Sequence, residues 1–504
     1  MPAQCTLNID KASYKGSIPI HTGHFIDGKW CDPKFATILL GSSADVDMAV
    51  QAAQKAYKTS WGLKILGSER GRLLNRLADL LERDKDHFSA IESLNIGKPF
   101  HFCRTFEIPK AIECLRYFGG WADKNQGKLV PTDETKLAYT RHEPYGVVGQ
   151  IIPWNFPIPM LAWKIAPALA TGNCVVLKPS EIAPLSTMKF AELIEEAGFP
   201  PGVVNIVNGY GNVSFDCTGI YYILPSLGHT VGQAITEHPG IAKVAFTGST
   251  AVGRKILEAA AKSNLKSVTL ELGGKSPIIV FDDCDLEQTV KWAVNGIFIN
   301  AGQVCVAGSR IFVQDTIYEA FMREFTPIAA GLAGTAGDPF QPITQHGPQV
   351  SQTHFDRVMS YIESGKSEGA TVHLGGARHG TEGYFIQPTI FTDCMPDMKI
   401  VKEEIFGPVV AIMKFGTETE VIEAANATTY GLACCVFSGD VSRAIRVAHQ
   451  LENGSAFVNS AMVTEPGAPF GGFKQSGIGR EQGEYALATY TQVKAVHVNL
   501  SMRI

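Results

Sequence analysis

Cys305 is a candidate nucleophile because of the residues that surround it in the sequence. It lies in NAGQVCVAGSR (residues 300–310), after a predicted helix and between Gly302 and Gly308. Glycines let the backbone come close to a bound molecule, and a cysteine thiolate is a strong nucleophile when a base or a positive charge activates it. A lone cysteine, however, is more often a small apolar core residue. Residue type alone therefore leaves both interpretations open.

Two further residues, Glu271 and Asn155, could assist such a nucleophile. Glu271 lies in LELGGK (270–275) at the end of an apolar run, where a carboxylate is costly to bury unless it is hydrogen-bonded or takes up a proton. It is either an exposed residue at a strand end or a general base with a raised pKa. Asn155 lies in the proline-flanked turn PWNFP (153–157) and can donate two hydrogen bonds. It is either an ordinary turn residue or one half of an oxyanion hole.

Two segments have the features of a nucleotide-binding site. KPSE (178–181) follows a short apolar run, and open α/β sheets bind ligands at the carboxyl ends of their strands. FTGST (246–250) precedes a predicted helix, whose N-terminus favours a phosphate, although this motif alone is a weak signal.

Short apolar runs that alternate with helical patterns would position these residues. The first series comprises strands and helices at residues 174–177, 188–197, 203–207, 243–246, 251–262 and 268–270. The second comprises strands at 277–281, 310–313, 409–413, 434–437 and 456–458, and helices at 286–299, 318–332 and 442–451. Such alternation predicts an α/β fold with two parallel sheets covered by helices. Residues 136–148 and 490–500 have the pattern of extended strands outside either unit, which predicts a small third layer or an arm that pairs with another subunit.

The composition argues against several other classes of protein. The 504 residues include 44 basic and 49 acidic side chains, which gives a formal net charge of −5. The chain therefore has no excess of positive charge with which to bind nucleic acid or an anionic membrane. No apolar run reaches the roughly 18 residues of a membrane span. The 11 cysteines form no C-x-x-C pair, so zinc and redox spacings are missing. Because the N-terminal stretch lacks the apolar core of a signal peptide, we expect a cytoplasmic protein with reduced thiols.

Together the motifs resemble those of the NAD(P)-dependent aldehyde dehydrogenase superfamily, in particular its general, fungal-type members. PWNFP, KPSE, FTGST, LELGGK, GQVC, EEIFGP (403–408) and PFGGFKQSG (469–477) occur in the order and at the spacings of that superfamily. The resemblance implies an aldehyde dehydrogenase-like α/β fold, with two doubly wound parallel-sheet domains and a small β arm for bridging and oligomerisation. The expected parts are an NAD-binding domain over 1–122 and 145–273, a catalytic domain over 274–475, and bridging segments over 123–144 and 486–504. A homotetramer or a homodimer is expected.

The resemblance also implies a role for each matched residue. Cys305 would attack an aldehyde, Asn155 and the Cys305 backbone N–H would hold the oxyanion of the thiohemiacetal, and Glu271 would activate water to hydrolyse the thioester. Glu481 would assist proton transfer. The expected cofactor contacts are Trp154, Lys178, Glu181, Gly211, Gly248, Ser249, Gly273, Glu404 and Phe406. Lys178 and Glu181 match the contacts to the adenosine ribose, where a carboxylate can accept a hydrogen bond from the 2′-hydroxyl and would repel a 2′-phosphate, while Lys178 softens that repulsion. NAD is therefore the expected cofactor, with NADP as the weaker alternative. The substrate tunnel would be lined by Phe156, Met160, Trp163 and Phe470, each of which could equally be plain core packing. Such a tunnel suits uncharged aliphatic or aromatic aldehydes, and no metal site is expected.

The sequence departs from the superfamily pattern at two places. Residues 213–229 (VSFDCTGIYYILPSLGH) are an apolar insertion beside the expected adenine pocket. They are interpreted as a retained intron or an error in the gene model, or else as a real functional loop. Residues 30–40 run straight into 41–47, so a hairpin that relatives have is shortened here. The main prediction is NAD-dependent oxidation of aldehydes to carboxylic acids. The alternative is a catalytically impaired or esterase-only homologue whose cofactor site these changes disturb.

Overall fold

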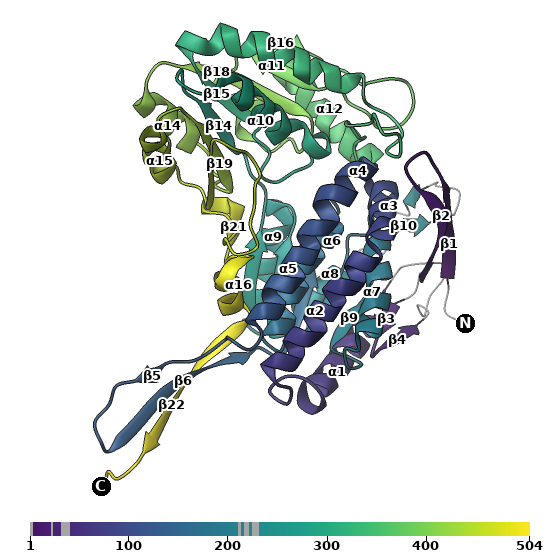
Figure 1. Ribbon diagram of the computed structural model, residues 1–504, viewed down its shortest axis with the longest axis vertical. Coiled ribbons are helices and arrows are strands. Elements are labelled where there is room, and N and C mark those ends of the chain that lie inside the picture. The colour runs from purple at the N-terminus through teal and green to yellow at the C-terminus, as the bar shows by residue number, and fades with distance from the viewer. Residues whose placement is uncertain are drawn as a thin grey trace.

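Two large twisted sheets and one narrow three-stranded sheet form the framework of the molecule, seen here in a computed structural model (Figure 1). The structure describes residues 4–21, 24–31, 41–209, 213–215, 221–223 and 231–503. Gly211, most of the 213–229 insertion and the shortened hairpin at residues 32–40 lie outside the described residues. Two short pieces of the insertion, β10 (Val213–Phe215) and β11 (Tyr221–Ile223), pair antiparallel.

The first sheet has eight strands, and a parallel group of five forms its centre. Its strand order is β21 (Gly477–Ile478), β13 (Ser267–Glu271), β12 (Lys243–Thr247), β7 (Val147–Ile151), β8 (Cys174–Lys178), β9 (Val204–Ile206), β3 (His24–Ile26) and β4 (Lys29–Cys31). The strands from β13 to β9 run parallel, and β21, β3 and β4 pair antiparallel at the two edges. Every residue of β7 and β8 is buried, which explains why these strands are mostly apolar, with Gln150 and Lys178 as their polar residues.

Helices pack on this sheet in two groups. One group comprises α1 (Ser43–Thr59), α8 (Val231–Glu237) and α9 (Thr250–Lys262). The other comprises α2 (Gly67–Arg83), α3 (Lys85–Ile96), α5 (Ile108–Trp121), α6 (Pro157–Ala170) and α7 (Leu185–Ala197). α2 buries Leu73, Leu74, Leu77 and Leu81 along one side, as an amphipathic helix does. α6 is apolar apart from Lys164 and is buried except at Met160, so it lies inside the domain.

The second sheet has seven strands and carries the other half of the fold. Its order is β16 (Thr371–Leu374), β17 (Thr389–Thr392), β18 (Val409–Phe415), β15 (Arg310–Gln314), β14 (Pro277–Val280), β19 (Ala433–Phe437) and β20 (Ser455–Val458). All neighbours run parallel except β16 and β17. The accompanying helices are α10 (Leu286–Phe298), α11 (Tyr318–Ala333), α12 (Gln352–Ser367), α13 (Lys399–Lys402), α14 (Glu418–Asn426) and α15 (Val441–Gln450). The last helix, α16 (Gly483–Thr489), packs instead against α6 of the first unit. The predicted alternation of strands and helices is confirmed in both sheets.

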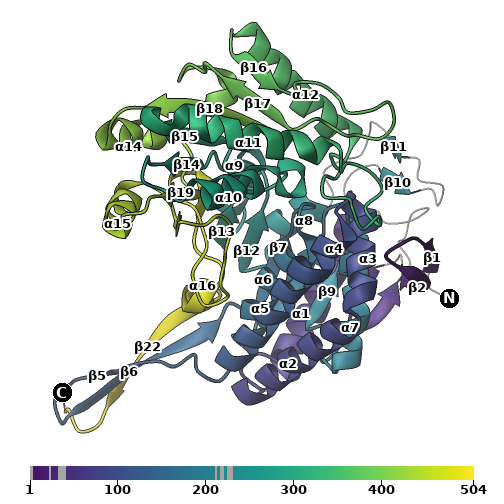
Figure 2. The same ribbon diagram turned by 45° about the horizontal axis from the view of Figure 1, so that its top comes forward.

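The third sheet projects from the body as an arm, and the C-terminus lies at its tip (Figures 1 and 2). β22 (Thr491–Asn499) pairs antiparallel with β6 (Lys136–Pro144), which pairs with β5 (Leu129–Val130). The prediction of one extended segment over 136–148 is wrong at its end, because the chain turns after Pro144 and enters the first sheet as β7. Gly146 has a φ of 111°, a conformation open to glycine, and this turn separates the two strands.

A hairpin at the N-terminus links the two halves. Its strands are β1 (Gln4–Asp10) and β2 (Lys15–His21), and Ile18 and Ile20 of β2 are fully buried. At the hairpin tip Lys11 forms an ion pair with Asp338 at 2.8 Å.

The domain boundaries drawn from the sequence stay predictions. Among the described residues, no helix combines the length and the apolar character that crossing a membrane requires.

Candidate active site

The turn before Cys305 has a backbone conformation that few side chains adopt. After α10 ends, Asn300 and Ala301 have φ values of 50° and 52°, and Gly302 has a φ of 74°. This left-handed conformation costs a non-glycine residue about 1–2 kcal/mol. Such strain persists where neighbouring groups hold it, and it is concentrated at functional sites. The turn is therefore a strained segment that ends at Cys305.

Amide side chains hold this turn and connect it to Asn155. The Asn300 side chain donates to the backbone oxygens of Asn155 at 3.3 Å and Gln303 at 3.2 Å. The Asn155 side chain donates to the Gln303 backbone oxygen at 3.1 Å, and the Gln303 side chain accepts from the Val350 backbone N–H at 2.9 Å. The structure thus brings Asn155 against the Cys305 turn. Sequence reasoning missed Asn300 and Gln303, although their position beside Cys305 in NAGQVC was an available signal.

Two acidic side chains lie close enough to Cys305 to affect its ionisation. The thiol is half-buried, and burial raises its pKa to about 12, with the negative charges of Glu404 and Glu271 adding to the rise. Glu271, the last residue of β13, is 5% exposed, and its Oε2 has no hydrogen-bond partner in the described part of the chain. Burial, and then the charge of Glu481, raises the pKa of Glu271 well above its usual value. The thiol therefore needs a base, and a buried carboxyl with raised affinity for protons lies beside it.

The paired glycines of LELGGK let three motifs meet at Cys305. The Gly274 N–H donates to Glu404 Oε1 at 3.0 Å. A Cβ on Gly273 would lie 2.3 Å from Glu404 Oε2, and one on Gly274 would lie 2.4 Å from the Cys305 carbonyl oxygen. Burial raises the pKa of Glu404 to about 7, and the Gly274 hydrogen bond opposes the rise. A side chain at Gly274 would overlap the Cys305 backbone, and one at Gly273 would push the Glu404 carboxylate out of its place.

An aromatic cluster lies next to Glu404. The rings of Trp154 and Phe406 meet edge to face at 5.4 Å, and the His354 ring lies 5.2 Å from Trp154. His354 Nε2 bonds to the Phe406 carbonyl oxygen at 2.8 Å, and burial lowers its pKa to about 4. Arg357 donates to the Glu404 backbone oxygen at 3.3 Å. Sequence reasoning missed His354 and Arg357, because nothing in α12 alone indicates which segment it contacts.

The two predicted nucleotide segments lie at strand ends of the first sheet. Lys178 ends β8, and its ammonium donates to Glu181 Oε2 at 3.1 Å. Ser249 caps the N-terminus of α9 and accepts from the Val252 N–H at 3.4 Å. The Gly248 N–H donates to the Glu271 backbone oxygen at 3.0 Å, which ties this turn to β13. A carboxylate that can accept from a ribose hydroxyl and a helix N-terminus that favours phosphate fit a dinucleotide.

The four predicted tunnel residues belong to one apolar cluster. Trp163 and Phe470 are buried and meet edge to face at 5.0 Å, whereas Phe156 and Met160 are half-buried. Next to Phe470 lies Glu481, and the two residues exchange backbone hydrogen bonds of 2.7 Å.

A buried lysine on α6 is the ion-pair partner of Glu481. Lys164 bonds to Glu481 Oε1 at 2.6 Å, and both side chains are nearly inaccessible. Glu481 Oε2 has no partner in the described part of the chain. Because the charge of Glu481 also acts on Glu271, this ion pair is electrostatically coupled to the candidate base.

Residues 31–496 match the aldehyde dehydrogenase family. The chain belongs to that family. It is 56% identical to an aldehyde dehydrogenase of Agaricus bisporus over the whole of both chains. It is 55% identical to one of Emericella nidulans over 90% of this chain and 88% of the relative. Its fold is similar to an NAD+ complex of an aldehyde dehydrogenase from Bacillus cereus, with a TM-score of 0.90 and 43% identity over 95% of this chain and 97% of the other.

These similarities confirm the recognition of the aldehyde dehydrogenase family from its motifs and the α/β fold class. Membership in the family makes the protein an oxidoreductase. The residue-level roles rest on the geometry above and are taken up as proposals. No group of three or more potential metal ligands occurs among the residues that the structure describes.

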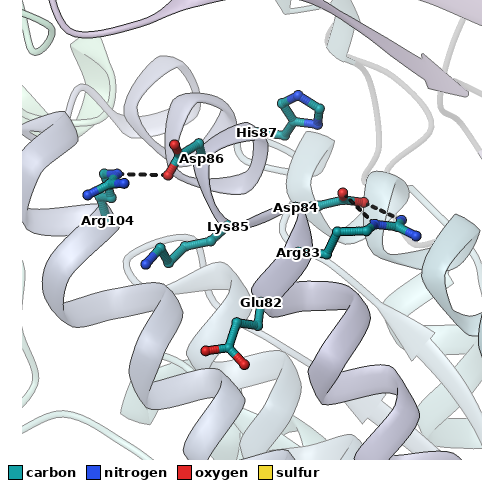
Figure 3. A pocket seen from close by; sticks show the side chains of 7 residues that line it. All are labelled: Glu82, Arg83, Asp84, Lys85, Asp86, His87 and Arg104. Carbon is teal, nitrogen blue, oxygen red and sulfur yellow. Dashed lines mark hydrogen bonds and ion pairs between the residues drawn. The ribbon is translucent and has the colours of Figure 1, made fainter.

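A surface hollow of about 370 Å³ is separate from this aldehyde dehydrogenase site. It lies where α2 meets α3 and is lined by Glu82, Arg83, Asp84, Lys85, Asp86, His87 and Arg104. Figure 3 shows that its charges pair with one another, Arg83 with Asp84 and Arg104 with Asp86. None of the candidate site residues lines it.

Replacing Gly302 with alanine should damage the active site of this aldehyde dehydrogenase. The backbone there has a φ of 74°, and a Cβ would lie 2.0 Å from the Gly407 carbonyl oxygen. Strain and overlap together should lower kcat at least about tenfold, because they displace Cys305. Gly331→Ala, where a Cβ meets nothing within 4 Å, is the matched control and should keep wild-type kcat. An unchanged kcat for Gly302→Ala would contradict the assigned geometry of the turn.

Proposed function

We propose that the protein oxidises aldehydes to carboxylic acids with NAD, through a thioester on Cys305. The observation that carries this proposal is the convergence of Asn155, Glu271 and Glu404 on the strained turn at Cys305. Membership in the aldehyde dehydrogenase family supports the same reaction class. The comparisons give no support to an impaired or esterase-only protein.

In the first half of the proposed reaction, Cys305 forms a bond to the aldehyde carbon. Glu271 accepts the thiol proton, and the sulfur attacks the carbonyl. The resulting oxyanion accepts hydrogen bonds from the Cys305 backbone N–H and from the second N–H of the Asn155 amide, since the first donates to Gln303. NAD, when bound, supplies the hydride acceptor that turns the thiohemiacetal into a thioester.

In the second half, Glu271 directs water to the thioester. Burial raises the pKa of Glu271 above its usual value, which makes this carboxylate a stronger base toward water. Before this step Glu481, paired with Lys164 at 2.6 Å, would pass the thiol proton of the first half from Glu271 to solvent, which leaves Glu271 able to accept again. Water then gives a proton to Glu271 while its oxygen attacks the thioester carbon. The C–S bond breaks to release the acid and the Cys305 thiolate, which takes the proton back from Glu271.

The cofactor is proposed to lie along the ends of β8, β12 and β13. Lys178 and Glu181 would bind the adenosine ribose, Trp154 and the α9 N-terminus at Ser249 would contact the pyrophosphate, and Glu404 would hold the nicotinamide ribose beside Phe406. Gly248 and Gly273 leave room for this approach, because a Cβ would meet the Phe246 ring at 2.4 Å and Glu404 at 2.3 Å. Gly211 keeps its predicted role as a further contact. A NAD+ complex of a relative is known, which supports NAD as the cofactor.

Changing Glu181 to serine should shift cofactor preference toward NADP. Serine removes the charge that repels a 2′-phosphate and frees Lys178, which now pairs with Glu181 at 3.1 Å. We expect the NADP-to-NAD ratio of kcat/KM to rise about tenfold or more. The matched control is Glu192→Ser, since Glu192 forms the equivalent i,i+3 pair with Lys189 at 2.6 Å, and it should leave the ratio unchanged. A Glu181→Ser ratio equal to wild type would show that this residue does not face the ribose.

The arm is proposed to join copies of the chain into a homodimer or homotetramer. It places Leu129, Val493 and Leu500 at the surface, with exposed fractions of 72%, 63% and 57%, and exposed apolar side chains on an edge sheet favour association. A cytoplasmic location is proposed from the sequence. Neither nucleic acid nor a membrane is proposed as a partner.

The direct test is NADH formation from acetaldehyde and NAD by the purified protein. Steady NADH formation is expected, with a smaller rate when NADP replaces NAD. If no NADH forms from any small aliphatic or aromatic aldehyde, the proposed function is wrong.

A further inference from the structure

A fully buried ion pair lies behind the predicted substrate tunnel. Lys98 follows the end of α3, and Glu107 ends the short π-helical turn η1 (Cys103–Glu107). The Lys98 ammonium lies 2.6 Å from Glu107 Oε1, and both side chains have zero exposure. The role of this pair is not explained by the reaction steps above.

The Lys98 ammonium also lies against an aromatic ring of the tunnel. It is 4.1 Å from the centroid of the Phe156 ring, which is within the range of a cation–π interaction and is strengthened by the absence of water. Phe156 directly follows Asn155, and its ring is half-buried. One part of the ring is therefore covered by Lys98, while another part stays open.

The segment that follows Lys98 contacts Phe156 from a second direction. The Phe102 ring lies 6.5 Å from Phe156, roughly edge to face, and stacks on Phe106 at 5.2 Å. On the outside of the turn Arg104 pairs with Asp86 of α3 at 2.7 Å, as Figure 3 shows. Short π-helical turns occur frequently at functional sites. Lys98 and Phe102 thus position one ring from two sides.

Protein stability alone does not explain why this charge pair is buried. Replacing a buried ion pair by apolar residues of similar size is often neutral or stabilising, so its presence favours a role in specificity. A second buried acid, Glu92, has no hydrogen-bond partner within the described chain for either oxygen. Burial and the charge of Glu107 raise the pKa of Glu92 well above its usual value. Glu107, whose Oε1 lies 2.6 Å from the Lys98 ammonium, is the counter-ion of Lys98.

We propose that Lys98 is a positioning residue that holds the Phe156 ring as a fixed wall of the substrate tunnel and thereby favours aromatic over small aliphatic aldehydes. This inference rests on the proposed function. An aromatic aldehyde would pack its ring against Phe156 and so depends on where that ring lies. Acetaldehyde is too small to depend on it. The effect should therefore appear as a change in the relative KM of the two substrates, without a loss of the chemistry at Cys305.

The test compares benzaldehyde with acetaldehyde in the full-length protein. In the double variant K98M/E107Q, which removes both charges at similar volume, the benzaldehyde-to-acetaldehyde ratio of kcat/KM should fall about fivefold to tenfold. The fall should come from a higher KM for benzaldehyde, and kcat for acetaldehyde should stay near wild type. R104A, which breaks the exposed pair on the same turn, is the control and should keep the wild-type ratio.

A double-mutant cycle separates positioning from a structural effect. In an F156L background, K98M/E107Q should leave the substrate ratio unchanged, because the ring on which Lys98 acts is gone. If the double variant does not fold, K98M alone removes the ammonium that contacts the Phe156 ring and should lower the ratio similarly.

An unchanged ratio in a folded variant that still oxidises acetaldehyde would overturn this inference and leave the proposed function intact. A fall that persists in F156L would also overturn it. If the wild-type protein forms no NADH from either aldehyde, the proposed function fails first and this inference fails with it.

Discussion

Alanine at position 305 should reduce NADH formation from acetaldehyde at least about a thousandfold, because no other group can form the covalent intermediate. Cys305 lies on the strained turn that Asn155 holds, and its side chain is half-buried. Removing one sulfur from such a site leaves a small gap, so the thermal unfolding temperature should change little. The measurement is NADH absorbance over time, together with the mass of the protein after acetaldehyde and NAD are added.

A second cysteine makes a close control for this prediction. Cys394 is also half-buried, and burial raises its pKa to about 12, as for Cys305. It lies apart from the amide-held turn, so Cys394→Ala should keep wild-type kcat. The prediction fails if Cys305→Ala retains more than a few per cent of wild-type activity, or if Cys394→Ala loses as much as Cys305→Ala.

Regular elements were the part of the fold most accessible to sequence reasoning. The strand β8 is buried on both faces and is therefore mostly apolar, while α10 and α11 repeat apolar residues at a helical period. The split between β6 and β7 was missed, because it depends on one turn at Gly146 inside an otherwise extended pattern. Apolar periodicity reports burial, and it does not report to which sheet a strand belongs.

Motif order revealed the candidate residues of the site, but not the groups that position them. Cys305, Glu271 and Asn155 belong to recognisable segments. By contrast, the hydrogen bond that the Val350 N–H donates to the Gln303 side chain and the contact of Lys98 with Phe156 join segments that are far apart in the sequence. Such contacts arise only when helices and loops pack together. A single sequence therefore indicates which side chains could react, and the three-dimensional structure is needed to find what holds them.

Glutamine at position 271 should lower kcat for acetaldehyde about 10²–10³-fold, because an amide cannot take a proton from the thiol or from water. In the wild type the rate should rise with pH through the pKa of Glu271, which burial and Glu481 raise well above the usual range. The acidic limb of the kcat profile should therefore lie well above the ordinary glutamate value of about 4.3, and it should disappear in E271Q. A limb that remains in E271Q would assign the base to another residue.

The same substitution should make the protein more stable, which distinguishes loss of a base from damage to the fold. A carboxyl whose pKa is higher in the folded state stabilises folding while it is protonated, and this contribution is lost as pH rises through the folded pKa. E271Q removes the ionising group, so its gain in unfolding temperature over wild type should be larger at pH 8 than at pH 5. Glu92, which is also buried with a raised pKa, is the control: E92Q should show the same stability trend while kcat for acetaldehyde stays near wild type. A destabilised E271Q would mean that its loss of activity reports misfolding, and the assignment of Glu271 as the base would lose this support.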